Sequence, residues 1–148
     1  MIRFFTLFIS LFVFNFSYAQ EKDFDVALDF YNQKQYNLAQ LIFENLDSDI
    51  ALLYNAKCSK NLASDDAVEL FNRLLNDFPY SIYHNEVYSS LAEIYYNDQD
   101  FSKVIIFYKK IEDKLKVNQK FHLAYSYFQL DSIENAKYYF SKLLSIDS

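Results

Sequence analysis

The chain of 148 residues contains no glycine and only one proline, Pro79. Loops that hold nucleotide phosphates need glycine for close approach of the backbone, so P-loop and dinucleotide-binding folds are excluded. A serine nucleophile elbow also needs glycine, and tight β-hairpins favour it, which argues against an all-β fold. The single cysteine, Cys58, cannot form an internal disulfide. Because it falls on the expected buried stripe of a helix, we interpret it as a small core residue.

Candidate catalytic and metal-ligating groups are sparse. The only histidines, His84 and His122, are far apart in sequence, and neither has a second ligand at metal-binding spacing. The run Asp98-Gln99-Asp100 resembles the start of a calcium loop, but the central glycine is missing and Lys109 stands where the closing glutamate belongs. We interpret these aspartates as helix-breaking and capping residues. The sequence therefore predicts no enzyme activity, no cofactor and no metal site.

The charge of the chain is acidic, with 20 Asp and Glu against 14 Lys and Arg and a formal net charge of −6. A nucleic-acid-binding protein needs a basic face, but the lysines at 109–110 and 114–120 are interleaved with Glu112 and Asp113. An acidic domain is also poorly suited to an anionic membrane surface. The composition therefore predicts neither nucleic acid nor a membrane surface as the partner.

Residues 1–19 have the three-part layout of a secretory signal peptide. Arg3 supplies a positive charge, residues 4–14 form an apolar run, and Ala19 ends a small-residue motif of the kind that signal peptidase cuts. The apolar run is shorter than the roughly 20 residues that a membrane-spanning helix needs. We predict cleavage after Ala19, a mature chain with no membrane span, and a periplasmic or secreted location. Retention of this segment as a membrane anchor is the alternative.

In the remaining chain, a small residue precedes an aromatic residue by four positions at four places. The pairs are Ala39 with Phe43, Ala67 with Phe71, Val104 with Tyr108, and Ala136 with Phe140. Their spacing is close to the period of a two-helix repeat, about 34 residues. The small residue lets a neighbouring helix approach closely, and the aromatic side chain fills the space beside it.

These pairs predict an all-α fold, an α-solenoid of about four antiparallel two-helix repeats over residues 20–148. The expected repeats lie near residues 20–47, 48–80, 81–116 and 117–148. Short polar breaks divide them into helices near 22–33, 36–46, 49–61, 65–77, 81–97, 101–113, 117–130 and 133–146. Asp100 is among the residues expected to cap a helix. Most of the 16 Phe and 14 Tyr should pack in the core.

The residues resemble the tetratricopeptide repeat (TPR) family over the whole expected mature chain, and most strongly over residues 80–146. The matching first-helix positions are Leu91, Ala92 and Tyr95, and Leu123, Ala124 and Tyr127. The matching second-helix positions are Tyr36, Ala39 and Phe43, and Phe101, Val104 and Tyr108; Ile133, Ala136 and Phe140 are close. The sequence departs from the family at Asn55, which takes a small-residue position, so we expect looser packing there.

The resemblance implies that the first helices line a concave groove that binds a partner. The side chains expected to face it are Phe24, Leu28, Tyr31, Leu52, Ala56, Lys60, Glu86, Ser89, Glu93, Tyr96, Asn118, Phe121, Tyr125 and Phe128. Such a groove is apolar at both ends and acidic in the middle, so it does not suit the carboxylate that some members of the family clamp. A peptide with apolar anchors and some basic charge suits it better. Packing of these side chains against a following helix is the alternative.

The last expected helix carries apolar residues close to the C-terminus, at Phe140, Leu143, Leu144 and Ile146. Terminal repeats usually end in a helix with a polar outer face. We therefore expect self-association through this helix, a partner at this end, or a longer protein.

Three functions agree with these features. The favoured one is an exported protein-interaction scaffold that binds a peptide or an envelope protein, as the resemblance to exported bacterial TPR proteins implies. The second is an N-terminal sensory or regulatory module of a longer signalling protein. The third is a glycan-binding envelope protein that uses Tyr31, Tyr96, Tyr125 and Phe128, and it predicts that a soluble glycan quenches tyrosine fluorescence.

Overall fold

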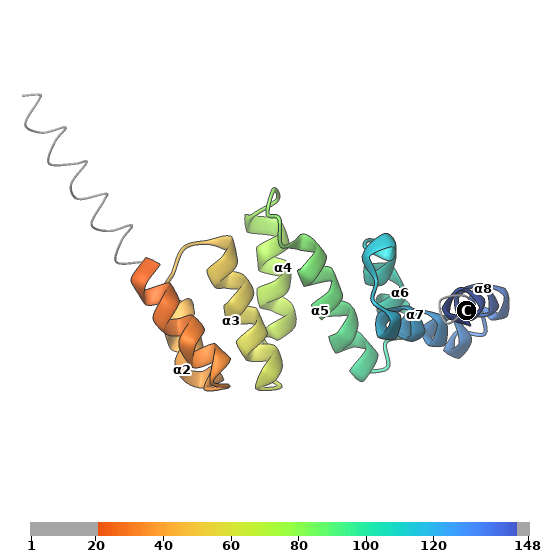
Figure 1. Ribbon diagram of the computed structural model, residues 1–148, viewed down its shortest axis with the longest axis horizontal. Helices are drawn as coiled ribbons and strands as arrows, with labels where there is room; N and C mark the ends of the chain where they lie inside the picture. The colour runs from red at the N-terminus through yellow and green to blue at the C-terminus, as the bar shows by residue number, and fades with distance from the viewer. Residues whose placement is uncertain (1–20, 145–148) are drawn as a thin grey trace, which may run out of the picture. The chain divides into compact units, whose positions relative to one another are not determined.

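The computed structural model describes residues 21–144, which contain helices and turns and no strand (Figure 1). The expected signal peptide and Ile146 lie outside these residues. Residues 21–32 are helical. The further helices are α2 (Tyr36–Phe43), α3 (Asp49–Asn61), α4 (Ala67–Asp77), α5 (His84–Asn97), α6 (Phe101–Lys109), the short 3-10 helix η1 (Glu112–Lys114), α7 (Val117–Gln129) and α8 (Ile133–Leu144). The all-helical fold predicted from the sequence is confirmed.

Several of the expected helices are shorter than predicted: α2 ends at Phe43 instead of residue 46, α4 begins at Ala67 instead of residue 65, and α5 and α6 are also shorter. The helix expected over residues 101–113 ends at Lys109, because Ile111 leaves the helical conformation (φ −130°, ψ 25°) and η1 follows it. The helix expected from residue 81 begins at His84. There the Ser81 hydroxyl accepts a hydrogen bond from the N–H of Tyr83 at 3.2 Å, and such a local bond stabilises a turn in place of a helix. Asp100 caps α6 as predicted, since its side chain accepts the N–H of Lys103.

Four turns share one backbone conformation, although the chain has no glycine. Lys34, Ala63, Gln99 and Asp131 have φ angles of 61°, 53°, 60° and 54°. In each turn the N–H of the next residue donates to the carbonyl oxygen five positions before it, at 2.9 Å. This is the Schellman motif, which normally places glycine at the left-handed position. Each motif falls between the first and second helices of one expected repeat, at a break that the sequence also predicted.

The described residues divide into two compact units, residues 21–70 and 71–144. In the first unit α2 packs on α3 around a core that includes Ala39, Phe43 and Cys58. The predicted pair of Ala39 and Phe43 is therefore buried. Cys58 is buried as predicted, and its burial raises the pKa of the thiol to about 11.

In the second unit α5, α6, α7 and α8 contact one another in order along the chain (Figure 1). The core includes the predicted pair of Val104 and Tyr108, and the small residues Ala92 and Ala124 of the first helices. All four are fully buried. The pattern of small residues beside large ones therefore sets the close contacts between helices. None of the described helices has both the length and the apolar content that crossing a bilayer requires.

Candidate partner-binding surface

In the first unit three of the predicted groove residues pack against the core and do not line an open groove. Phe24, Leu28 and Tyr31 are half-buried and pack against the core of this unit. The Tyr31 ring centroid lies 5.0 Å from that of Tyr54, in an edge-to-face arrangement, and the Phe24 centroid lies 5.9 Å from the same ring. Lys57 covers Tyr54, with its Nζ 4.7 Å from the ring centroid. These three side chains therefore support the packing alternative more than an open groove.

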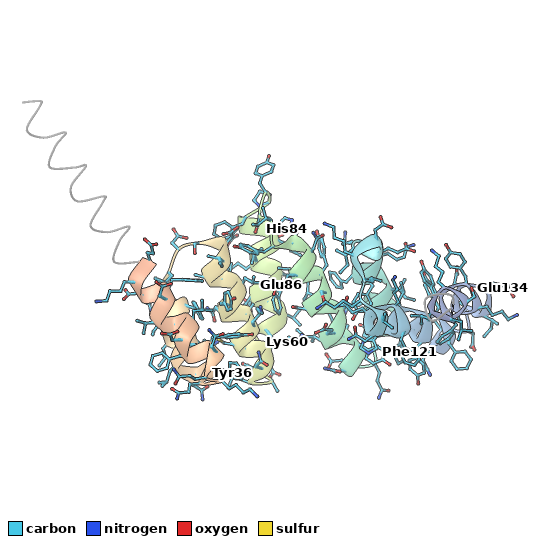
Figure 2. All side chains as sticks on the ribbon, viewed as in Figure 1. Tyr36, Lys60, His84, Glu86, Phe121 and Glu134 are labelled. Carbon is cyan, nitrogen blue, oxygen red and sulfur yellow. The ribbon has the colours of Figure 1, made fainter. Side chains whose placement is uncertain are left out.

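The other predicted residues of this unit come from α3. Leu52 and Ala56 are buried, with 4% and 0% of their surface exposed, so neither offers surface to a partner. Lys60 is half-buried (Figure 2). The physical reason is that α3 is buried on more than one side, since Ala51, Leu53, Cys58 and Ser59 are also buried.

In the second unit five aromatic side chains form a contiguous patch, which we call the aromatic surface. Its members are Tyr96 of α5, Phe101 of α6, and Phe121, Tyr125 and Phe128 of α7. The Tyr125 ring is the centre, because its centroid lies 5.9 to 6.4 Å from those of the other four. Four of the five were predicted as groove residues, and the structure brings them together.

The helical period places three of these rings on one face of α7, since Phe121, Tyr125 and Phe128 are spaced by four and three residues. Phe121 and Phe128 are 46% and 51% exposed. Large aromatic side chains that stay exposed side by side are typical of binding surfaces in proteins. The sequence pattern missed Phe101, because it occupies a packing position of the repeat.

His122, for which the sequence predicted no role, packs against the aromatic surface. The His122 ring stacks on Tyr96 with centroids 3.9 Å apart and an angle of 13° between the planes. Its Nδ1 lies 3.5 Å from the hydroxyl of the fully buried Tyr108. Burial lowers the pKa of His122, and the nearby Glu93 opposes this shift more weakly. The imidazole is therefore neutral at pH 7 and acts as a flat packing partner.

Polar predicted residues lie on α5 and at the start of α7. Glu86 and Asn118 are exposed, whereas Ser89 and Glu93 are half-buried. The buried Gln119 connects two of them: its Nε2 donates to Ser89 Oγ at 2.6 Å and to Glu93 Oε1 at 3.4 Å. Gln119 was not predicted, because a glutamine near a helix start is usually exposed. These bonds hold α7 on α5 and position the aromatic surface.

A hollow of about 370 Å³ opens beside the aromatic surface. Its lining consists of Tyr96, Asn97, Gln99, Phe101, Tyr125 and Gln129, and so of three rings and three carboxamides. None of these six side chains is charged. The hollow lies where α5 and α7 end and α6 begins.

A second hollow, of about 210 Å³, is lined by charged and polar groups around Tyr139 of α8. The Tyr139 hydroxyl donates to Glu112 Oε1 at 2.7 Å and accepts from Lys109 Nζ at 3.0 Å, and Lys109 also pairs with Glu112. The side chains of Lys109, Glu112 and Tyr139 therefore satisfy one another, and this network connects η1 to α8. No cluster of three or more potential metal ligands occurs in residues 21–144.

The exposed face of α8 is mixed in character. It exposes the apolar side chains of Ile133, Tyr138 and Leu144 together with Glu134 and Lys137 (Figure 2). Glu134 and Lys137 form an ion pair at 3.4 Å. Self-association through this helix stays a prediction.

The fold is similar to that of a solved structure described as "MamA AMB-1 P212121". The TM-score is 0.71 at 21% sequence identity, and the alignment covers 87% of this chain and 73% of that one. At this identity the likeness shows the fold, a TPR-like helical architecture. No family model matches the chain, and no curated protein matches it.

Proposed function

We propose that this protein is an exported interaction scaffold of the TPR family, and that it binds a peptide or an envelope protein through the aromatic surface. The observation that carries the proposal is the exposure of Phe121 and Phe128 next to Tyr96 and Tyr125. Exposed aromatic rings bury a large apolar area when a partner binds. Aromatic anchor residues supply much of the binding energy in many interfaces.

The character of the partner follows from the surroundings of these rings. Glu86 and Glu93 lie on α5, and the chain carries a formal net charge of −6. A partner segment with apolar anchors and basic residues is therefore electrostatically complementary. The TPR-like fold supports this proposal, because stacked helical hairpins present extended surfaces for binding.

The exported location is part of the proposal and rests on residues 1–19 alone. Signal peptidase would release a chain that starts at Gln20. N-terminal sequencing of the protein recovered from the periplasm or the medium tests this directly. An N-terminus at Met1 in a membrane fraction would instead establish an anchored protein.

The binding surface is tested by site-specific photocrosslinking in the native cells. The photoreactive analogue p-benzoylphenylalanine replaces Phe128 in the full chain, and the matched control carries it at Tyr138 of α8. Both native side chains are aromatic and 51% exposed. We expect one specific adduct with another protein from position 128, lost when Phe121→Glu is added, and no adduct with another protein from position 138, where self-association of α8 would give only adducts between copies of this chain. Equal adducts at both positions, or none at position 128, would refute the proposed surface.

A further inference from the structure

We infer that the hollow beside the aromatic surface binds a cationic side chain of the partner, an arginine or a lysine, against the rings of Tyr96, Phe101 and Tyr125. The inference rests on the proposed function and names the chemistry that the scaffold recognises. It does not depend on which protein supplies the basic residue.

The first argument is that lysine side chains of this chain lie over several of its other tyrosine rings. Nζ of Lys103 lies 4.5 Å from the ring centroid of Tyr95, and Nζ of Lys110 lies 5.3 Å from that of Tyr88. Similar contacts, between 4.4 and 6.0 Å, cover Tyr31, Tyr54, Tyr138 and Tyr139. Within residues 21–144, no lysine or arginine covers Tyr96, Phe101 or Tyr125. The hollow therefore offers three aromatic rings that no cation of the described residues covers, with His122 stacked on one face of Tyr96.

The second argument is the arrangement of the three rings. The planes of Tyr96 and Phe101 meet at 74°, those of Phe101 and Tyr125 at 80°, and those of Tyr96 and Tyr125 at 62°. Their centroids are 5.9 to 6.2 Å apart. Rings at such steep angles form walls of different orientation around the hollow. A cation inside it can approach ring faces from more than one direction, which strengthens the attraction.

The third argument concerns the carboxamides of Asn97, Gln99 and Gln129, which line the hollow beside the rings. All three residues are exposed. Each carboxamide oxygen can accept a hydrogen bond. A guanidinium presents five N–H donors in one plane and also stacks on aromatic rings, so it can use the rings and the amide oxygens together. An ammonium uses the same groups with three donors.

The fourth argument is the electric field at the hollow. Asn97 and Gln129 are the last residues of α5 and α7, and a helix C-terminus favours a positive charge. The N-terminus of α6 also lies there, but it is capped by the Asp100 side chain. Asp100 in turn pairs with Lys103 at 2.9 Å, and this lysine is directed to Tyr95. The fixed charges and helix ends therefore favour a cation over an anion.

A neutral sugar is the other ligand that rings and carboxamides could bind, and charge separates the two. The experiment titrates the purified protein with N-acetyl-arginine amide, with its neutral isostere N-acetyl-citrulline amide, and with the trimer of N-acetylglucosamine. Binding is followed by the ¹³C–¹H NMR shifts of the Tyr and Phe rings. We expect the arginine compound to shift Tyr96, Phe101 and Tyr125 and to bind about fivefold or more tightly than citrulline, because a cation–π contact contributes about 1 kcal/mol.

Two substitutions at one exposed position supply matched variants. Gln129→Lys places a cation of the protein itself in the hollow and should weaken arginine binding about tenfold, whereas Gln129→Glu should strengthen it. Circular dichroism checks that both variants stay folded. Equal binding of arginine and citrulline, or no effect of Gln129→Lys, would overturn the inference. A preference for the sugar would also overturn it and identify a saccharide site.

The arginine titration and the crosslinking experiment can fail independently of each other. A specific adduct at position 128 together with no arginine binding would leave the scaffold intact and remove only the cationic pocket. Arginine binding without any adduct would support the pocket and refute the partner surface. Loss of a captured adduct in the Gln129→Lys variant would connect the two.

Discussion

The four left-handed turn residues offer the sharpest test of how this glycine-free chain folds. We predict that replacing Lys34, Ala63, Gln99 and Asp131 together by glycine stabilises the protein. In the left-handed region the Cβ atom of an L-residue crowds the following carbonyl oxygen, which costs about 1–2 kcal/mol per residue. Glycine removes this strain, but its greater freedom in the unfolded chain costs about 0.5–1 kcal/mol.

The centres of these two ranges differ by about 0.75 kcal/mol, which is the expected net gain per turn. The turns share no hydrogen-bond partner, so the gains should add to roughly 2–4 kcal/mol in the four-glycine variant. Asp131 should contribute least, because aspartate tolerates the left-handed conformation better than most residues. Urea unfolding followed by circular dichroism measures the effect as a higher midpoint.

The matched controls are the exposed C-caps of the second helices, which have ordinary right-handed angles. Glu44 has φ −63° and Lys110 has φ −67°. Glu44→Gly should destabilise the protein by about 0.5–1 kcal/mol, because only the entropic term remains. Lys110→Gly should cost more than Glu44→Gly, because it also removes the contact of Lys110 with the Tyr88 ring. A four-glycine variant whose midpoint equals or falls below that of the native chain would refute the reasoning. It would mean that these turns do not hold the left-handed conformation.

Three further predictions concern the core and the acid stability. Asn55 is 6% exposed and its Oδ1 accepts no hydrogen bond within the described residues. Asn55→Ala should therefore raise the free energy of unfolding, measured in urea, by about 1 kcal/mol. A decrease of that size would show that the amide has a hydrogen-bond partner. Ala92 is fully buried, so Ala92→Arg should abolish the cooperative thermal transition. Glu93→Arg should keep a helical spectrum and a cooperative transition at a slightly lower midpoint, because it removes the 3.4 Å bond from Gln119, and it should weaken partner binding. The contrast fails if both variants unfold alike. Hydrogen bonds from Lys109 and Tyr139 lower the pKa of Glu112. Its contribution, under about 1 kcal/mol, is therefore present above the ordinary glutamate pKa and is lost as the pH falls through the lowered value. Glu112→Gln should flatten the decline of the urea midpoint below about pH 4, and an unchanged decline would exclude this role.

The sequence by itself determined the helices and the pairing of α5 with α6 and of α7 with α8. These features depend on local properties, such as the spacing of Ala39 and Phe43 or of Val104 and Tyr108, and both pairs are buried as predicted. Asp100 could be identified as a cap because it needs only the backbone of the next turn. The left-handed turns were not foreseen, since no glycine marks them.

Only the tertiary structure decided which first-helix side chains stay open to a partner. Tyr31 and Phe128 occupy equivalent positions in the repeat pattern, each three residues before a left-handed turn residue, yet Tyr31 packs against Tyr54 of α3 while Phe128 stays 51% exposed. The exposure of a groove side chain depends on the size and placement of residues that are distant in sequence. The repeat pattern does not show which of these residues pack against it. The hollow is the clearest case, because it forms where the ends of α5 and α7 meet the start of α6.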